Sequence, residues 1–175
     1  MGEKGTGTIQ LYTGNGKGKT TASLGAALRC LGHGGRVAMV QFMKGRLYGE
    51  IAAARSLDGL TIEQYGRDEF VDPENPEAID REFAERGWAR AEELVKDTGL
   101  DMLILDEINV AVSFGLIPLE RVLDFMRQRP PHLELILTGR YAPDAMIELA
   151  DTVTEMSEIK HHYKNGVNAR KGIEF

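Results

Sequence analysis

A glycine-rich segment at residues 14–21 constrains the fold of this chain more than any other feature. It reads Gly-Asn-Gly-Lys-Gly-Lys-Thr-Thr, after an apolar run at residues 8–13 and at the start of a helical pattern at residues 19–31. Glycines let successive backbone N–H groups turn toward phosphate oxygens, and a helix N-terminus adds partial positive charge. The segment therefore predicts a phosphate-binding loop between a strand and a helix.

The side chains of this loop refine the prediction. Lys19 would place a positive charge on the phosphates, and the Thr20 hydroxyl could ligate a magnesium ion. The loop is a variant, because Thr13 stands where the usual pattern G-x-x-x-x-G-K-[ST] has its first glycine, and Gly14 follows one place later. The dinucleotide pattern G-x-G-x-x-G fails, since its third glycine would fall at Lys19. A tight glycine turn with incidental lysines is the alternative interpretation.

Apolar, β-rich runs alternate with longer segments of helical period along the rest of the chain, which is typical of a mostly parallel sheet covered by helices. We expect one α/β domain over residues 1–175. The expected strands are residues 8–13, 36–42, 61–65, 102–105, 133–138 and 152–156, and the expected helices are residues 19–31, 51–57, 77–97, 118–129 and 143–149. An irregular surface loop is expected over residues 66–76, and the polar segment 158–175 has no clear assignment.

Composition narrows the class of protein. Hydrophobic residues make up 42% and charged residues 27%, which is ordinary for a globular domain, and the net charge is -6. An acidic balance disfavours nucleic acid as a partner. The single cysteine fits a reducing compartment, and no run approaches the roughly 18 apolar residues that span a bilayer. We expect a cytoplasmic protein with no membrane and no nucleic-acid partner.

A carboxylate pair follows a short apolar run. Asp106 and Glu107 end the run at residues 102–105, which has the composition of a central strand buried on both faces. Carboxylates at the carboxyl end of a strand beside a phosphate loop are placed to hold a metal ion, directly or through water. The alternatives are an acidic pair that only ends a strand, or a glutamate that polarises a water for γ-phosphate hydrolysis.

Several blocks together resemble the phosphate-loop family of ATP:corrinoid adenosyltransferases. The blocks are residues 13–21, Arg29 with Gly32-His33-Gly34, residues 40–45 (Val-Gln-Phe-Met-Lys-Gly), residues 100–107 and the tail at 159–175. The Thr13-Gly14 arrangement is itself the family's form of the loop. The resemblance covers nearly the whole chain, and it implies a P-loop NTPase-like (RecA-like) fold with helices on both faces of the sheet.

The resemblance also implies an activity: transfer of the 5′-deoxyadenosyl group of ATP to the cobalt of a reduced corrinoid, with release of triphosphate. Cobalt(I) is a strong nucleophile that attacks C5′ of the ribose, so the protein must hold the reactants together and stabilise the departing triphosphate. ATP would lie reversed in the loop. The implied cofactors are Mg2+ or Mn2+, and the implied partners are a flavin-dependent reductase or flavodoxin as electron donor and a second copy in a homodimer.

Site residues follow from the motifs and the resemblance together. Lys19 and Phe70 are the expected catalytic residues. The expected ATP-binding residues are Thr13, Gly14, Asn15, Gly16, Lys17, Gly18, Lys19, Thr20, Thr21 and Arg29; the metal residues are Thr20, Asp106 and Glu107; and the corrinoid-binding residues are Phe42, Lys44 and Phe70. A solvated helix position is the alternative for Arg29.

Phe70 is assigned because the family can present aromatic residues that crowd the lower face of the cobalt and favour the more easily reduced four-coordinate state. The alternative is a hydrophobic pin that holds the loop to the core. Some family members carry an N-terminal helix that covers the corrinoid. Here only a few glycine-rich residues precede the first strand, so we expect weaker cover or cover from elsewhere.

Two rival functions use the same loop. A plain NTPase or small-molecule kinase would cleave the γ-phosphate instead of releasing triphosphate. An ATP-dependent regulatory or DNA-associated RecA-like module would need a basic stripe with aromatic residues, and the acidic composition counts against it.

Overall fold

The computed structural model describes residues 5–46 and 48–174. Its six-stranded sheet has the order β3-β2-β4-β5-β1-β6, and every pairing between neighbours is parallel. The strands are β1 (Ile9–Thr13), β2 (Val37–Phe42), β3 (Leu60–Tyr65), β4 (Met102–Asp106), β5 (Glu134–Thr138) and β6 (Thr152–Glu155). The expected α/β class with a parallel sheet is confirmed.

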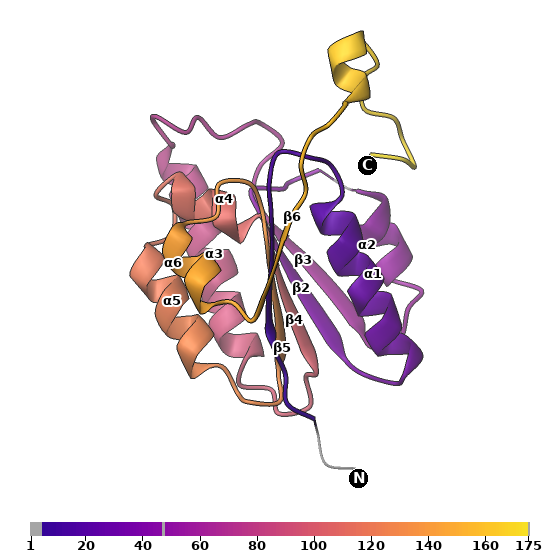
Figure 1. The fold of residues 1–175 in the computed structure, drawn as a ribbon, viewed down its shortest axis with the longest axis vertical. Helices are drawn as coiled ribbons and strands as arrows, with labels where there is room; N and C mark the ends of the chain where they lie inside the picture. The colour runs from indigo at the N-terminus through magenta and orange to yellow at the C-terminus, as the bar shows by residue number, and fades with distance from the viewer. Residues whose placement is uncertain (1–4, 47, 175) are drawn as a thin grey trace.

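Helices cover both faces of this sheet. Figure 1 shows α1 (Lys19–Gly32) and α2 (Gly49–Ala54) on one face. The other face carries α3 (Ala78–Leu94), α4 (Ile108–Ser113), α5 (Leu119–Gln128) and α6 (Asp144–Leu149). Crossover helices on both faces are what a parallel sheet requires, because each parallel connection must cross over it.

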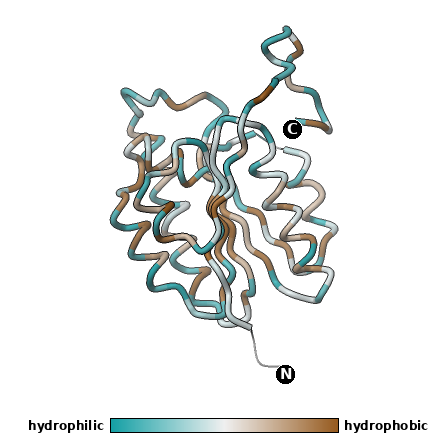
Figure 2. Tube along the Cα trace, in the orientation of Figure 1, coloured by the Kyte–Doolittle hydropathy of each residue, from teal (hydrophilic) through white to brown (hydrophobic). Residues whose placement is uncertain are grey.

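The core follows from strands that are buried on both sides. Every residue of β2 and of β4 is buried, and Figure 2 shows the hydrophobic colour concentrated along the middle of the sheet. Alternate residues serve different cores, as the two-residue period of a strand demands. Val40 and Phe42 pack in the cluster with α3, whereas Val37 and Met39 pack in the cluster with α1.

Two local structures differ from the sequence-based expectation. The short helix α4 directly follows β4 and was not expected, because its residues Ile108 to Val112 are all buried and so show no polar face. The tail, which had no assignment, contains a 3-10 turn at His162–Asn165. The other expected elements are present, with ends that differ by a few residues.

The topology collects loops at one edge of the sheet. Because all strands are parallel, their carboxyl ends lie on the same side, where the glycine-rich loop connects β1 to α1 and the C-terminal tail crosses above the sheet (Figure 1). After β1 the chain crosses one face of the sheet through α1 and enters β2, which is separated from β1 by β5 and β4. After β3 it crosses the opposite face through α3 and enters β4, between β2 and β5. Ligands of open α/β sheets bind at the carboxyl ends of strands where the order reverses in this way. No helix within 5–46 or 48–174 is long and apolar enough to cross a membrane.

Trp88 is the residue on which the α3 side of the core most depends. It is fully buried, its ring meets Phe125 edge-on at 5.2 Å, and its indole N–H donates to Glu92. We expect Trp88→Ala to lower the free energy of unfolding by about 3–5 kcal/mol, the usual cost of removing a buried aromatic ring. Urea denaturation measures this, with half-buried Phe83→Ala on the same helix as the matched control. Equal losses in the two variants would contradict the assigned role of Trp88.

Candidate functional site

The glycine-rich loop turns back against the segment that follows β6. Gly14 and Gly18 have φ angles of 92° and 118°, in the left-handed region that only glycine enters freely. A Cβ on Gly14 would lie 2.5 Å from the Met156 carbonyl oxygen, and the Gly16 N–H donates to that same oxygen at 2.6 Å. The glycines therefore serve both the turn and the close approach.

Lys19 begins α1 and points back into the loop. Its ammonium group donates to the carbonyl oxygens of Gly14 at 2.7 Å and Gly16 at 2.8 Å. Burial is the main cause that lowers the pKa of this lysine, and the neighbouring positive charge of Arg140 also lowers it. The loop thus holds a partly desolvated cation at the helix N-terminus, where an anion is favoured.

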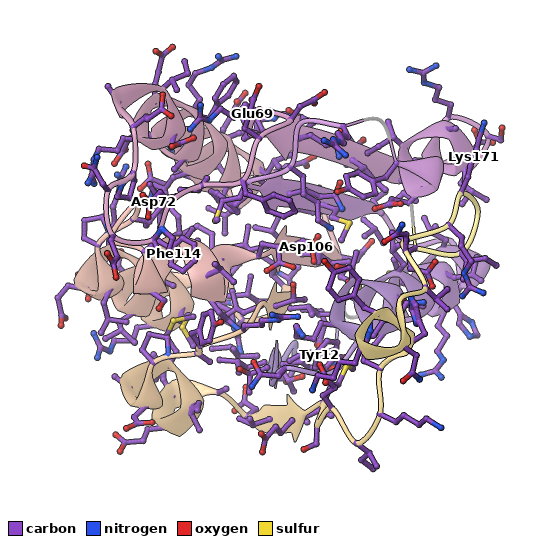
Figure 3. The ribbon with its side chains drawn as sticks, turned by 90° about the horizontal axis from the view of Figure 1, so that it is seen from above. Tyr12, Glu69, Asp72, Asp106, Phe114 and Lys171 are labelled. Atoms are coloured by element: carbon purple, nitrogen blue, oxygen red, sulfur yellow. The ribbon has the colours of Figure 1, made fainter. Side chains whose placement is uncertain are left out.

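Asp106 lies at the centre of the site and is fully buried. One carboxylate oxygen accepts from the hydroxyls of Thr20 at 2.9 Å and Thr138 at 2.6 Å. The other accepts from the Gln41 amide at 3.1 Å and from the Lys44 ammonium group at 2.6 Å. Four donors from different segments of the chain therefore saturate this carboxylate, which is how a buried charge is stabilised. Figure 3 shows Asp106 near the middle of the carboxyl edge, between the loop that carries Glu69 and Asp72 and the tail residue Lys171.

Glu107 differs from its neighbour, because no described residue donates a hydrogen bond to its carboxylate. It has a φ of 63° at the start of α4, and its backbone N–H donates to the Thr138 hydroxyl at 3.1 Å. Burial and the negative charge of Asp106 raise the pKa of its carboxyl group. The cations that oppose this shift are Lys44, Lys19 and Arg140. Glu107 is thus the carboxylate of this pair whose oxygens are still available to a ligand.

The structure places Lys44 and Phe42 differently from the expectation that they bind the corrinoid. The Lys44 ammonium group lies in the phosphate-loop site, 3.3 Å from the Thr20 hydroxyl oxygen, in the ion pair with Asp106. Burial lowers the pKa of Lys44, but the Asp106 carboxylate, together with the charges of Glu107 and Glu50, outweighs this effect and raises the pKa overall. Phe42 is fully buried and packs under α3, where an ideal Cβ on Gly87 would lie 3.0 Å from its ring. It contributes to the core and offers no contact surface.

Phe70 lies in the irregular loop between β3 and α3. Its side chain is 98% exposed, so the alternative in which it pins the loop to the core is wrong. The loop is held instead by Arg67, whose guanidinium donates to Asp80 at 2.7 Å and to Glu77 at 2.6 Å. The Phe70 ring therefore projects from an anchored loop into solvent, and its corrinoid-binding role stays a prediction.

The remaining expected ATP-binding residues are not all brought together. Residues 13–21 form the loop and the first turn of α1, and Lys17 pairs with Glu174 of the tail at 2.9 Å. Arg29 lies ten residues beyond Lys19, about 15 Å along the helix axis. It lines a groove with Tyr12 and His33. The fold therefore does not bring Arg29 to the loop within this chain.

Other site residues were not anticipated from the sequence. Gln41 was detectable in principle, as a polar side chain inside the otherwise apolar strand β2. Thr138 and Arg140 carry no local signal. A further feature is backbone conformation: among the described residues, the non-glycine positions with positive φ are Met43, Glu107 and Tyr141, and they follow the carboxyl ends of β2, β4 and β5 in turn. Such strain concentrates at functional sites.

The sequence is similar to known proteins over almost its whole length. Residues 5–175 match the family described as ATP:corrinoid adenosyltransferase BtuR/CobO/CobP. A corrinoid adenosyltransferase of Pseudomonas aeruginosa is 39% identical over 170 residues, which cover 97% of this chain and 84% of that protein. Proteins of the same description from Sinorhizobium sp and Escherichia coli K12 are 40% and 37% identical, again over 97% of this chain and over 80% and 86% of their own lengths.

The matched segment includes the glycine-rich loop, the Asp106-Glu107 pair and the tail, which are the parts that make up the site. The resemblance seen in the sequence is therefore confirmed, and cleavage of the γ-phosphate by an NTPase or kinase is not favoured. The chain belongs to the ATP:corrinoid adenosyltransferase family, whose members transfer the adenosyl group of ATP to a corrinoid.

Proposed function

We propose that the phosphate loop holds the triphosphate of ATP as a leaving group while cobalt(I) of a bound corrinoid attacks C5′ of the ribose. The observation that carries this proposal is the Lys19 ammonium group, which is held inside the loop at the N-terminus of α1. In the reaction the cobalt donates an electron pair to form the cobalt–carbon bond. The C5′–O5′ bond breaks, and triphosphate leaves with the electrons of that bond.

Groups of this protein are placed to stabilise the departing triphosphate. Lys19 and the loop N–H groups would stabilise the charge that develops on the leaving oxygen, and a preorganised cation in a partly dry site does this without reorganisation. No side chain needs to remove a proton, because cobalt(I) is already a nucleophile. The rest of the task is positioning, which the carboxyl ends of β1, β4 and β5 provide.

We assign a divalent cation, Mg2+ or Mn2+, to Thr20 and Glu107. Thr20 donates its hydroxyl proton to Asp106, and one lone pair of its oxygen faces the Lys44 ammonium group at 3.3 Å, so the second lone pair can accept a cation. No described residue donates a hydrogen bond to the Glu107 carboxylate. The described residues contain no group of three or more histidine, cysteine, aspartate or glutamate side chains that could hold a metal ion. Mg2+ takes few protein ligands and is otherwise completed by phosphate oxygens and water. When bound, the ion would neutralise phosphate charge.

The corrinoid would approach over the rim that carries Phe70. An exposed ring there can cover the lower face of a planar macrocycle by apolar contact. We further propose that the protein acts in the cytoplasm, receives electrons through a flavin-dependent reductase or flavodoxin, and forms a homodimer. The edge strand β6 supports the last proposal, since all of its residues are exposed and it pairs only with β1 within the described chain.

We expect Lys19→Ala to abolish turnover, because the leaving triphosphate loses its main charge partner. The protein is incubated anaerobically with ATP and a chemically reduced corrinoid, and inorganic triphosphate and the cobalt–carbon product are quantified. A fall of at least about 100-fold in kcat is expected for the loss of one preorganised charge. The control is Lys96→Ala, at an exposed position beyond the end of α3. Formation of ADP and phosphate without the cobalt–carbon product would contradict the proposed adenosyl transfer.

We expect Glu107→Gln to stabilise the nucleotide-free protein near neutral pH while it impairs transfer. Burial and Asp106 raise the pKa of Glu107 in the folded state, so keeping it ionised costs folding free energy above that pKa. The advantage of the glutamine variant should shrink as pH falls through the raised pKa, because the wild-type group is then neutral. Urea denaturation with a chelator, at about pH 7.5 and about pH 5, measures this change. Exposed Glu120→Gln on α5 is the control; a variant less stable than wild type at both pH values would contradict the prediction.

We expect Phe70→Ala to slow the reduction of a five-coordinate cobalt(II) corrinoid more than transfer to a corrinoid already at cobalt(I). The reason is that the ring would act by displacing the lower ligand, which matters only before reduction. Paired assays, one with the flavin-dependent electron donor and one with chemical reductant, separate the two steps. Phe70→Leu should recover part of the loss because it restores apolar contact. Equal losses in both assays would remove this role.

A further inference from the structure

Arg140 is a cation beside the phosphate loop that the sequence motifs do not identify. It follows β5 and the turn at Gly139, which has a φ of 134°. No described residue forms an ion pair or hydrogen bond with its guanidinium group. An exposed arginine with no partner in the described part of the chain, next to the glycine-rich loop, is available to an anionic ligand.

The backbone that carries Arg140 is fixed to the root of the loop on both sides. The Gly139 N–H donates to the Tyr12 carbonyl oxygen at 3.1 Å, and the Ala142 N–H approaches the Thr13 hydroxyl at 3.4 Å. The buried Asn109 amide donates to the carbonyl oxygens of both Tyr12 at 3.2 Å and Gly139 at 3.0 Å. The backbone at Arg140 is therefore joined to the end of β1 by hydrogen bonds on both sides, and it cannot shift unless β1 and the loop shift with it.

A cavity lies next to this anchored segment. It has a volume of about 450 Å³ and is lined by Asn15 of the loop, Arg140, Glu155, Ser157, Glu158 and Lys164. Glu158 is already paired with Lys164. The neighbouring residue, Tyr141, stacks on Phe114 at 6.4 Å between ring centroids. Arg140 is thus an arginine that lines this cavity together with Asn15 of the glycine-rich loop.

We propose that Arg140 binds the triphosphate chain, at the end that extends past Asn15, and positions it for departure. The inference rests on the proposed function for the identity of the ligand. A guanidinium group can contact two phosphate oxygens at once, whereas Lys19 acts as a point charge, so the two residues serve different parts of the chain. The positive charge of Arg140 also acts, after burial, to lower the pKa of Lys19, which agrees with their closeness.

Inorganic triphosphate is the probe that tests this inference without the corrinoid. Its affinity is measured by calorimetry with Mg2+ for wild type, Arg140→Ala, Arg140→Gln and Arg140→Lys. We expect affinity to fall at least tenfold in the two neutral variants and to recover in part in the lysine variant, which keeps charge but loses the paired contact. Arg127→Ala, at an exposed arginine of α5 paired with Asp124, is the matched control and should bind as wild type does.

The outcomes separate the two proposals. Triphosphate affinity that is unchanged in both neutral variants, each with a wild-type unfolding midpoint, would overturn the role of Arg140 even if adenosyl transfer is observed. Loss of triphosphate affinity in a protein that makes no cobalt–carbon product would support Arg140 and reject the proposed reaction. A fall in the unfolding midpoint of both neutral variants with unchanged affinity would assign Arg140 to the neutralisation of Glu155 and Glu158, and would also overturn the inference.

Discussion

The buried carboxylate of Asp106 is the interaction on which the rest of the site depends. It accepts from the first turn of α1, from the end of β2, from the loop after β2 and from the end of β5. These segments are far apart in the sequence, and a charge with no exposed surface holds them in register at one edge of the sheet. Removing one partner of such a buried pair typically costs about 3–5 kcal/mol, because the remaining charge is left uncompensated. The two adjacent acids also differ in role: the Asp106 carboxylate binds side chains of the protein, whereas the Glu107 carboxylate is available to a ligand.

Most of the fold could be predicted from the sequence because its signals are local. Apart from Gln41 and Asp106 near their carboxyl ends, the strands β2 and β4 are apolar runs, as expected for strands buried on both faces, and α1 begins where the glycines end. The helix α4 could not be predicted in the same way. Its buried face extends around the whole helix, so the residues Ile108 to Val112 look like a continuation of the strand before them. Burial of this kind is determined by tertiary packing, and it leaves no helical alternation of apolar and polar residues in the sequence.

The site was only partly predictable, and the reason is again physical. The loop residues and the Asp106-Glu107 pair are motifs, since their chemistry depends on neighbours in sequence. The roles of Lys44 and Arg140 depend on which strand ends lie next to one another, and strand order is set by the crossovers of α1 and α3. Lys44 was expected to contact the corrinoid, which stays a prediction, and its ion pair with Asp106 at the loop could not be foreseen from the sequence. Arg29 shows the reverse case, in which a helix position near the loop in sequence lies about three turns away from it in space.

The positive φ angles at Met43, Glu107 and Tyr141 bear on how this protein can change. Each such non-glycine residue typically stores about 1–3 kcal/mol of backbone strain, which glycine would release. A search for greater thermal stability would therefore be drawn to these three strand ends, yet glycine at position 107 would delete the available carboxylate, and at position 141 the ring that stacks on Phe114. The carboxyl edge of the sheet, where such substitutions would raise the free energy of unfolding, is also the edge that carries the functional site. Variants selected for heat resistance alone would tend to become better folded and less able to hold a nucleotide.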